Sequence, residues 1–143
     1  MDRDELCEKL SDDAKPHIDK VWEMYNAPFA RHMGIEVEYL GFDKVICTME
    51  LKEEHMNSMS RGHGGAVFTL MDHTFAFATN IEYDCTGIET SISYHRPAAG
   101  RLRATATPIN RSRSLRHFEV MVEDEAGKLV ASGKCVSFVL KRD

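Results

Sequence analysis

The segment 65–83 most constrains the fold, because its spacing predicts a helix that is apolar nearly all round. A helix of this kind is buried, yet the run falls short of the roughly 18 apolar residues that a membrane span needs. We therefore expect the rest of the chain to wrap around it. Its apolar residues are Ala66, Val67, Phe68, Leu70, Met71, Phe75, Ala76, Phe77 and Ala78.

Strand-like alternation of apolar and polar residues flanks this helix on both sides. Residues 3–25 look helical, with Pro16 in the first turn of a second short helix, and residues 26–33 are expected to form a connector. The order lacks regular βα alternation, so the fold class is α+β, with a mostly antiparallel sheet curled around one buried helix. The strands are expected within 34–51 (two strands, with a turn at 41–44) and at 88–94, 102–107, 118–123 and 129–140.

The composition excludes several classes of protein. The 143 residues suit one domain, the net charge is −5, and the basic residues are scattered, so nucleic acid is not expected as a partner. The acidic N-terminus lacks the apolar core of a signal peptide, and the four cysteines form no Cys-x-x-Cys pair. These features predict a cytoplasmic protein with reduced thiols and no membrane association. Histidine spacing favours no metal site.

Asp72 lies in the middle of the buried helix, beside mostly apolar neighbours. Burial of an unpaired carboxylate is unfavourable or raises its pKa. A functional role is one interpretation. Pairing with an arginine, or capping of a neighbouring element, is the other, and the local pattern supports both equally.

His63, Gly64 and Gly65 open the same helix, where free backbone N–H groups favour negative charge. The glycines suit a tight turn, or they present donors to a carbonyl oxygen. His63 orients the turn or takes part in chemistry. Asn57 is a turn residue, or its amide holds a carbonyl, a water molecule or a carboxylate.

The N-terminus and the middle of one helix are too far apart to contact the same small chemical group. Eight residues separate Gly64 from Asp72, which corresponds to about 12 Å along a helix. If Gly64 and Asp72 act on one substrate group, one of them must come from another subunit. The spacing therefore predicts an obligate oligomer with the site at the interface.

The pattern Asn57-x5-His63-Gly64-Gly65-x6-Asp72 resembles the signature of the hotdog-fold acyl-CoA thioesterases, in particular the PaaI-like branch. The segments 68–80 and 92–98 extend this resemblance, which covers about residues 29–140. It implies a hotdog fold, in which a long antiparallel sheet wraps the central helix. It also implies a homodimer or a dimer of dimers, with the site between protomers, and a division into a helical segment 1–28 and a hotdog domain 29–143.

The resemblance assigns roles to individual residues. Asp72 would be the nucleophile or general base, and the Gly64 N–H would polarise the thioester carbonyl. Asn57 and His63 would position the thioester or the attacking water from the opposite subunit. Substrate contacts are expected at Gly65, at Thr86 and Gly87, where relatives often carry a water-holding hydroxyl (with Thr90 nearby), and at Arg111 and Arg113 for the CoA nucleotide.

We therefore expect hydrolysis of an acyl-CoA thioester, without cofactor or metal. An aromatic acyl group is favoured only through the resemblance to the PaaI-like branch. The alternatives are a non-catalytic acyl-CoA-binding or regulatory protein and, less favoured, a hotdog hydratase or dehydratase. For Arg111 and Arg113, the alternative to nucleotide binding is that they belong to a solvent-exposed face of the sheet.

Overall fold

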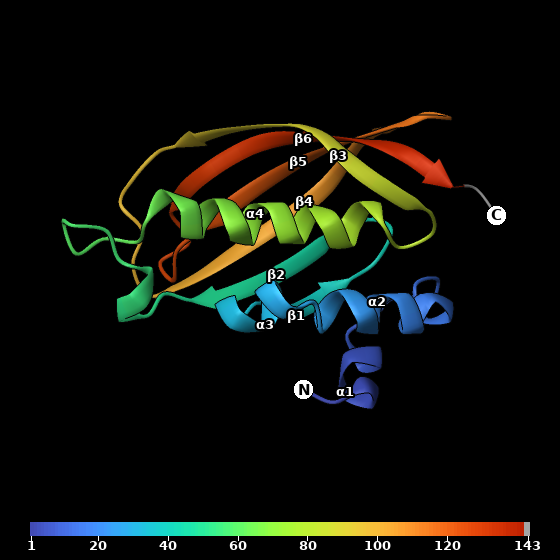
Figure 1. The fold of residues 1–143 in the computed structure, drawn as a ribbon, viewed down its shortest axis with the longest axis horizontal. Coiled ribbons are helices and arrows are strands. Elements are labelled where there is room, and N and C mark those ends of the chain that lie inside the picture. The colour runs from blue at the N-terminus through green and yellow to red at the C-terminus, as the bar shows by residue number, and fades with distance from the viewer. Residues whose placement is uncertain (142–143) are drawn as a thin grey trace.

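A computed structural model describes residues 1–141 of the chain. Three short helices come first, one long helix lies in the middle of the chain, and six strands make up most of the rest (Figure 1). In chain order the α-helices and strands are α1 (Arg3–Glu8), α2 (Ile18–Tyr25), α3 (Pro28–Met33), β1 (Glu36–Leu40), β2 (Val45–Glu50), α4 (Gly64–Thr79), β3 (Asp84–Tyr94), β4 (Arg101–Arg111), β5 (Leu115–Glu123) and β6 (Leu129–Lys141). Two short 3₁₀ helices, η1 (Lys15–His17) and η2 (Glu53–His55), precede α2 and α4.

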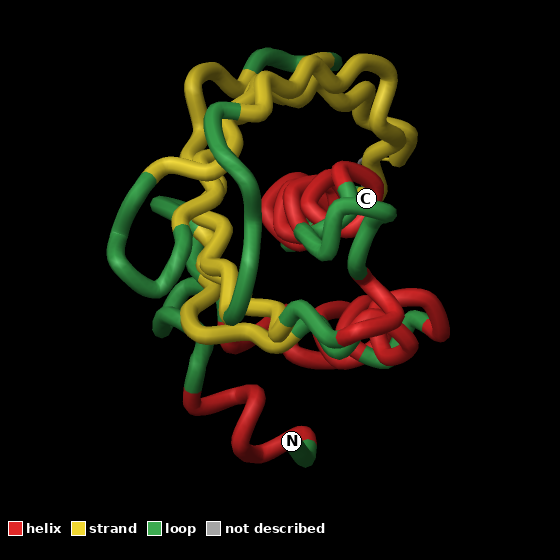
Figure 2. The backbone as a smooth tube through the Cα atoms, turned by 90° about the vertical axis from the view of Figure 1, so that its left-hand side faces the viewer, coloured by secondary structure: helices red, strands yellow, loops and turns green. Residues whose placement is uncertain are grey.

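The six strands form one antiparallel sheet in the order β1-β2-β4-β5-β6-β3. The sheet curls around α4 and leaves one side of the helix uncovered (Figure 2). The expectation of an α+β fold with an antiparallel sheet around a central helix is confirmed. Strand β3 precedes three other strands in the chain, yet it lies at the sheet edge beside the last one.

The core lies between α4 and the concave face of the sheet. Leu70, Met71 and Phe77 of α4 are almost fully buried, and burial stabilises each such side chain by about 1.5–3 kcal/mol. The strands contribute alternate residues, as in β4, where Leu102, Ala104 and Ala106 face inward. Cys47 and Cys135 are fully buried, free cysteines of this core.

Residues 26–33 are not a simple connector, because α3 forms there. Pro28 occupies its first turn, where a missing N–H is tolerated. Gly34 ends it in the left-handed conformation, with φ of 70°. These two signals were visible in the sequence, but a helix of six residues shows too little periodicity to be recognised.

The central helix ends at Thr79, before the expected end near residue 83. The Asn80 side chain is the reason, because it links the last turn to the next strand. Its amide nitrogen donates to the Ala76 carbonyl at 2.9 Å, and its oxygen accepts from the Cys85 N–H at 2.8 Å. Strand β3 therefore begins at Asp84, earlier than the expected residue 88.

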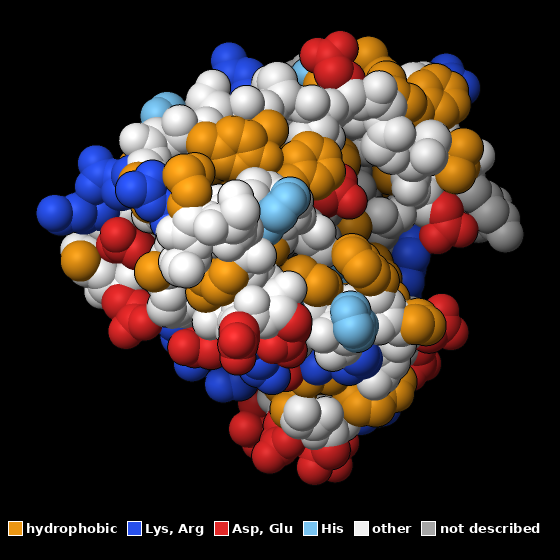
Figure 3. Space-filling model, turned by 60° about the vertical axis from the view of Figure 1, so that its left-hand side comes forward, with side chains coloured by type: hydrophobic (Ala, Val, Ile, Leu, Met, Phe, Trp, Pro, Cys, Tyr) orange, Lys and Arg blue, Asp and Glu red, His pale blue; other side chains and the backbone are white. Residues whose placement is uncertain are grey.

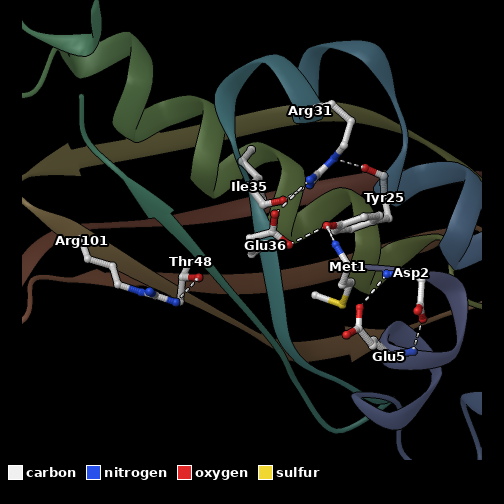
Figure 4. Close-up of polar contacts among 9 residues, drawn as sticks. All are labelled: Met1, Asp2, Glu5, Tyr25, Arg31, Ile35, Glu36, Thr48 and Arg101. Atoms are coloured by element: carbon white, nitrogen blue, oxygen red, sulfur yellow. Dashed lines mark hydrogen bonds and ion pairs between the residues drawn. The ribbon is translucent and has the colours of Figure 1, made fainter. Parts of the chain in front are cut away.

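The N-terminal helices are attached to β1 by a polar cluster (Figure 4). The Tyr25 hydroxyl donates to Glu36 at 2.6 Å, and Arg31 pairs with the same carboxylate at 3.0 Å. The Arg31 guanidinium also lies 3.7 Å from the centre of the Tyr25 ring. Burial, together with the bond to Glu36, raises the pKa of Tyr25 to about 12. The division into 1–28 and 29–143 stays a prediction.

Across residues 1–141, the helices are all too short or too polar to cross a membrane.

Candidate active site

The loop before α4 is organised by the side chain of Asn57. Its Oδ1 accepts the backbone N–H groups of Met59 at 2.9 Å and Arg61 at 3.2 Å. These two donors fix the orientation of the amide, so Nδ2 remains available as a donor. The loop also holds Ser60 at φ of 58°, which is uncommon outside glycine. Asn57 is thus a turn residue, and its Nδ2 makes none of the hydrogen bonds found among residues 1–141.

His63 caps the N-terminus of α4. Its Nδ1 accepts the Gly65 N–H at 2.8 Å, so this nitrogen is unprotonated and the ring proton lies on Nε2. The Gly65 N–H is therefore occupied. The Gly64 N–H takes part in none of the hydrogen bonds among the described residues. Of the two glycines, it is Gly64 that retains a donor at the positive end of the helix.

Tyr94, at the end of β3, packs against Gly64 and was not assigned a role from the sequence. Its hydroxyl donates to the Gly64 carbonyl at 3.1 Å. A Cβ atom at position 64 would lie 3.4 Å from its ring. The pairing of Tyr94 with the inward-facing Ala131 places it on the α4 side of the sheet, a placement that strand alternation alone can suggest.

A cavity of about 350 Å³ opens beside this turn. Asn57, Gly64 and Tyr94 line it, together with the apolar side chains of Val67 and Val130. Figure 3 turns this end of the molecule forward and shows basic side chains gathered along one edge of it. The cavity therefore brings together a free backbone donor and a free side-chain amide.

Asp72 lies elsewhere, on the exposed face of α4. Although solvent reaches this carboxylate, partial burial raises its pKa above the ordinary value. None of the arginines or lysines among the described residues forms a salt bridge with it. Pairing with an arginine, the structural explanation for this residue, is thus not seen within one chain. Asp72 is absent from the cavity lining, and it lies about 12 Å along the helix from Gly64.

Strand β3 determines which hydroxyl lies near Asp72. Thr86 is exposed and pairs with the exposed Phe138, so it faces away from α4. Gly87 faces inward, where a Cβ atom would lie 3.5 Å from Phe75. An irregularity between Gly87 and Glu89 then shifts the register. The sequence does not reveal such a bulge, so alternation alone does not predict which positions beyond it face inward.

Thr90 lies on the inner face beyond this irregularity, opposite the buried Cys135. Burial raises the pKa of the Cys135 thiol to about 11, while a hydrogen bond with Thr90 lowers it and the charge of Asp72 raises it. Thr90 therefore contacts this thiol, and the charge of Asp72 acts on it. Thr90, and not Thr86, is therefore the hydroxyl on the face of the sheet that is turned toward α4, the helix that carries Asp72.

Arg111 and Arg113 lie far along the chain from the cavity and do not line it. Arg111 donates to the Phe42 carbonyl at 2.7 Å, and its guanidinium lies 5.5 Å from the centre of the Phe118 ring. Arg113 is exposed between β4 and β5. Their role in nucleotide binding stays a prediction.

Comparison with known proteins adds a family and several relatives. The family model described as Domain of unknown function (DUF4442) matches residues 18–139. The chain is 32% identical to acyl-coenzyme A thioesterase 13 of Homo sapiens over 97 residues, 64% of this chain and 69% of that protein. It is 28% identical to the proofreading thioesterase EntH of Cronobacter turicensis over 114 residues, 76% of this chain and 83% of that protein.

A solved structure has the same architecture. A mutant of the phenylacetic acid degradation protein PaaI from Thermus thermophilus superposes with a TM-score of 0.77 at 30% sequence identity. The match covers 80% of this chain and 100% of the other.

Proposed function

Because the chain belongs to the DUF4442 family and to the PaaI-like branch of the hotdog-fold thioesterase superfamily, we propose that it hydrolyses acyl-CoA thioesters with Asp72 as the catalytic carboxylate. Thioester hydrolysis is the activity of the named relatives. One observation carries the finer assignment: Asp72 has a raised pKa and no ion-pair partner among the described residues. Such a carboxylate suits a base more than a structural ion pair.

The site is completed by a second copy of the chain. Strand β3 is a sheet edge of 11 residues whose side chains are all exposed or half-buried. Unpaired edges of this length offer backbone groups to another strand. Addition of a partner's β3 would extend the sheet and cover the open side of α4 (Figure 2). Asp72 of one subunit would then face the Asn57 and Gly64 half of the other.

In this arrangement the thioester carbonyl oxygen accepts the free Gly64 N–H, and the Asn57 Nδ2 adds a second donor. Asp72 removes a proton from a water molecule held by Thr90, and the water oxygen bonds to the carbonyl carbon. The C–S bond then breaks, and the thiolate takes the proton from Asp72. Direct attack by Asp72, with hydrolysis of the resulting anhydride, is the second route. The raised pKa favours the first, because it makes Asp72 a stronger base.

The activity is tested by release of free thiol from a panel of aryl- and alkyl-CoA thioesters. Asp72→Asn should lower kcat by about 10²–10⁴-fold, the usual contribution of a general base. Below the raised pKa of Asp72 the base is protonated, so kcat/KM of the wild type should fall as the pH falls through that value. The panel also tests the expected preference for aromatic acyl groups.

Glu82→Gln is the matched control, because Glu82 is an exposed carboxylate just beyond the end of α4. It should leave kcat unchanged. Equal rates for the wild type and Asp72→Asn would refute the role of Asp72. Tight binding of acyl-CoA without turnover above background would instead support the acyl-CoA-binding alternative. The cytoplasmic location stays a prediction.

A further inference from the structure

Two consecutive peptide groups at the start of α4 determine where the Gly64 N–H points. The first joins His63 to Gly64 and carries this N–H. Its carbonyl accepts the N–H groups of Ala66 at 2.9 Å and Val67 at 3.2 Å. The second joins Gly64 to Gly65. Because a glycine Cα lies between them, and glycine restricts its φ and ψ angles less than other residues do, the direction of the N–H depends on the bonds that hold both groups.

The second peptide group is bonded at both ends. Its N–H, from Gly65, donates to His63 Nδ1 at 2.8 Å, and its carbonyl accepts the Tyr94 hydroxyl at 3.1 Å. Among the bonds that the described residues make to these two peptide groups, only the bond from Tyr94 comes from the sheet. Tyr94 therefore fixes the second peptide group relative to the sheet.

The end of β3 is itself attached to β6, so Tyr94 extends from a fixed position. Tyr94 pairs with Ala131. The next residue, His95, donates its backbone N–H to the Val130 carbonyl at 2.7 Å, and its Nε2 lies 2.8 Å from the Ser132 hydroxyl. Strand β3 ends beside the start of α4 (Figure 1).

Tyr94 is more exposed than a tyrosine that stabilises a fold by burial. Its relative exposure is 53%, and it lines the cavity together with Gly64. A Cβ atom added to Gly64 would meet its ring at 3.4 Å, so the ring lies directly against the start of the helix. Tyrosines that act through burial are usually more enclosed. The placement therefore suits support of the donor in the cavity.

We propose that Tyr94 is a positioning residue, whose hydroxyl holds the peptide group between Gly64 and Gly65 so that the Gly64 N–H points into the cavity. The inference rests on the proposed function, in which this N–H donates to the thioester carbonyl. Tyr94 acts on the reaction through Gly64, because its own proton is donated to the protein. Donors to a developing oxyanion are effective because they are oriented before the reaction starts.

The first test replaces Tyr94 by phenylalanine, which removes the hydroxyl and keeps the ring beside Gly64. Displacement of a catalytic group by about 1 Å can cost about 10²-fold in rate, so Tyr94→Phe should lower kcat for acyl-CoA by about 10–10²-fold. KM should change by less than about twofold, because the lost bond is made within the protein and not to the substrate. Thermal unfolding should show that the variant remains folded.

The second test measures the hydrogen bond to the substrate directly. In Asp72→Asn, which should bind acyl-CoA without rapid turnover, a donor lowers the infrared stretching frequency of a ¹³C-labelled thioester carbonyl. Adding Tyr94→Phe to this variant should move the frequency back toward that of the free thioester. A loss of folded protein would lower the signal without moving its frequency, so this measurement separates positioning from a merely structural role.

Tyr39→Phe is the matched control. It also loses a tyrosine hydroxyl, which donates to Asp43 at 2.9 Å, but Tyr39 lies in β1 and outside the cavity lining. This variant should leave kcat and KM unchanged. Amide hydrogen exchange of Gly65, followed by NMR without substrate, should be faster in Tyr94→Phe and unchanged in Tyr39→Phe.

The outcomes separate this inference from the proposed function. If the wild type hydrolyses acyl-CoA and Tyr94→Phe has the same kcat, or leaves the carbonyl frequency unchanged, the positioning role is wrong and the proposed function stands. A lower kcat with unchanged Gly65 exchange would mean that the hydroxyl contacts the substrate itself, which also overturns the role. If the wild type hydrolyses no thioester, the proposed function fails, and Gly65 exchange decides. Faster exchange in Tyr94→Phe alone would then support the hold of Tyr94 on the peptide group, and equal exchange in both variants would overturn it.

Discussion

At the residue scale, His63 combines a structural task with a position directly before Gly64, the proposed donor to the thioester carbonyl. Its Nδ1 caps α4 by accepting the Gly65 N–H, and its Nε2 is left as a donor. Removal of a helix N-cap typically lowers the free energy of unfolding by about 1 kcal/mol. We therefore expect His63→Ala to be destabilised by this amount in urea unfolding and to lose activity. Asparagine also caps helices well, so His63→Asn should recover the lost stability.

The activity of His63→Asn separates the two tasks. If the imidazole only caps the helix, this variant should hydrolyse thioesters at the wild-type rate. If Nε2–H positions the thioester or the water, stability should return while kcat/KM stays low. Full recovery of both would contradict the positioning role carried over from the PaaI-like family.

At the scale of elements, the β3–β6 pair depends on Gly133. A Cβ atom at this position would lie 2.1 Å from the backbone oxygen of Ser91 in β3, and it would also crowd Met71 of α4. The backbone cannot yield without breaking the pairing, so Gly133→Ala should lower the free energy of unfolding by about 1–3 kcal/mol. In the Gly133→Ala variant, hydrogen exchange should be faster in β3 than in β4, relative to the wild type.

Gly87→Ala is the matched control for Gly133→Ala, because Gly87 lies in the same strand pair. Its Cβ would meet Phe75 at 3.5 Å, an ordinary contact. We expect at most a small change in stability. An equal loss in both variants would point to strand propensity rather than close approach as the cause.

The elements were largely predictable, and the relations between them were less so. The apolar run from Ala66 to Ala78 and the alternation of β4 directly reflect burial. In contrast, the length of α4 depends on the side-chain bonds of Asn80, and the inward position of Thr90 depends on a bulge in β3. The register of β3 is set by pairing with β6, far along the chain, whereas the Asn80 bonds are local side-chain contacts that apolar periodicity does not report. Strand alternation can suggest which face of the sheet carries Tyr94, but the sequence does not show that its hydroxyl bonds to Gly64.

At the scale of the whole molecule, the two halves of the proposed site lie apart within one chain. Asp72 lies outside the cavity that contains Asn57 and Gly64. In a two-fold dimer each site would take one half from each subunit. Mixing two inactive variants, Asp72→Ala and Asn57→Ala, should therefore restore activity. Random pairing gives half mixed dimers with one intact site each, so about a quarter of the wild-type rate is expected.

The controls for this mixing experiment are each variant alone and a mixture kept from exchanging subunits. Light scattering should report a dimer or a dimer of dimers for every protein. A mixed sample that stays inactive although exchange has occurred would mean that both halves act within one subunit.

The position of β3 in the sheet has a consequence for the order in which the protein matures on the ribosome. Strand β3 ends at Tyr94, but its neighbour β6 begins only at Leu129. Pairing between segments so distant in the chain has to await the later one. A nascent chain therefore holds β1, β2, β4 and β5 in reach of α4 before β3 has a partner strand. A second subunit can therefore join the edge of the complete six-stranded sheet only after β6 has been synthesised and has paired with β3.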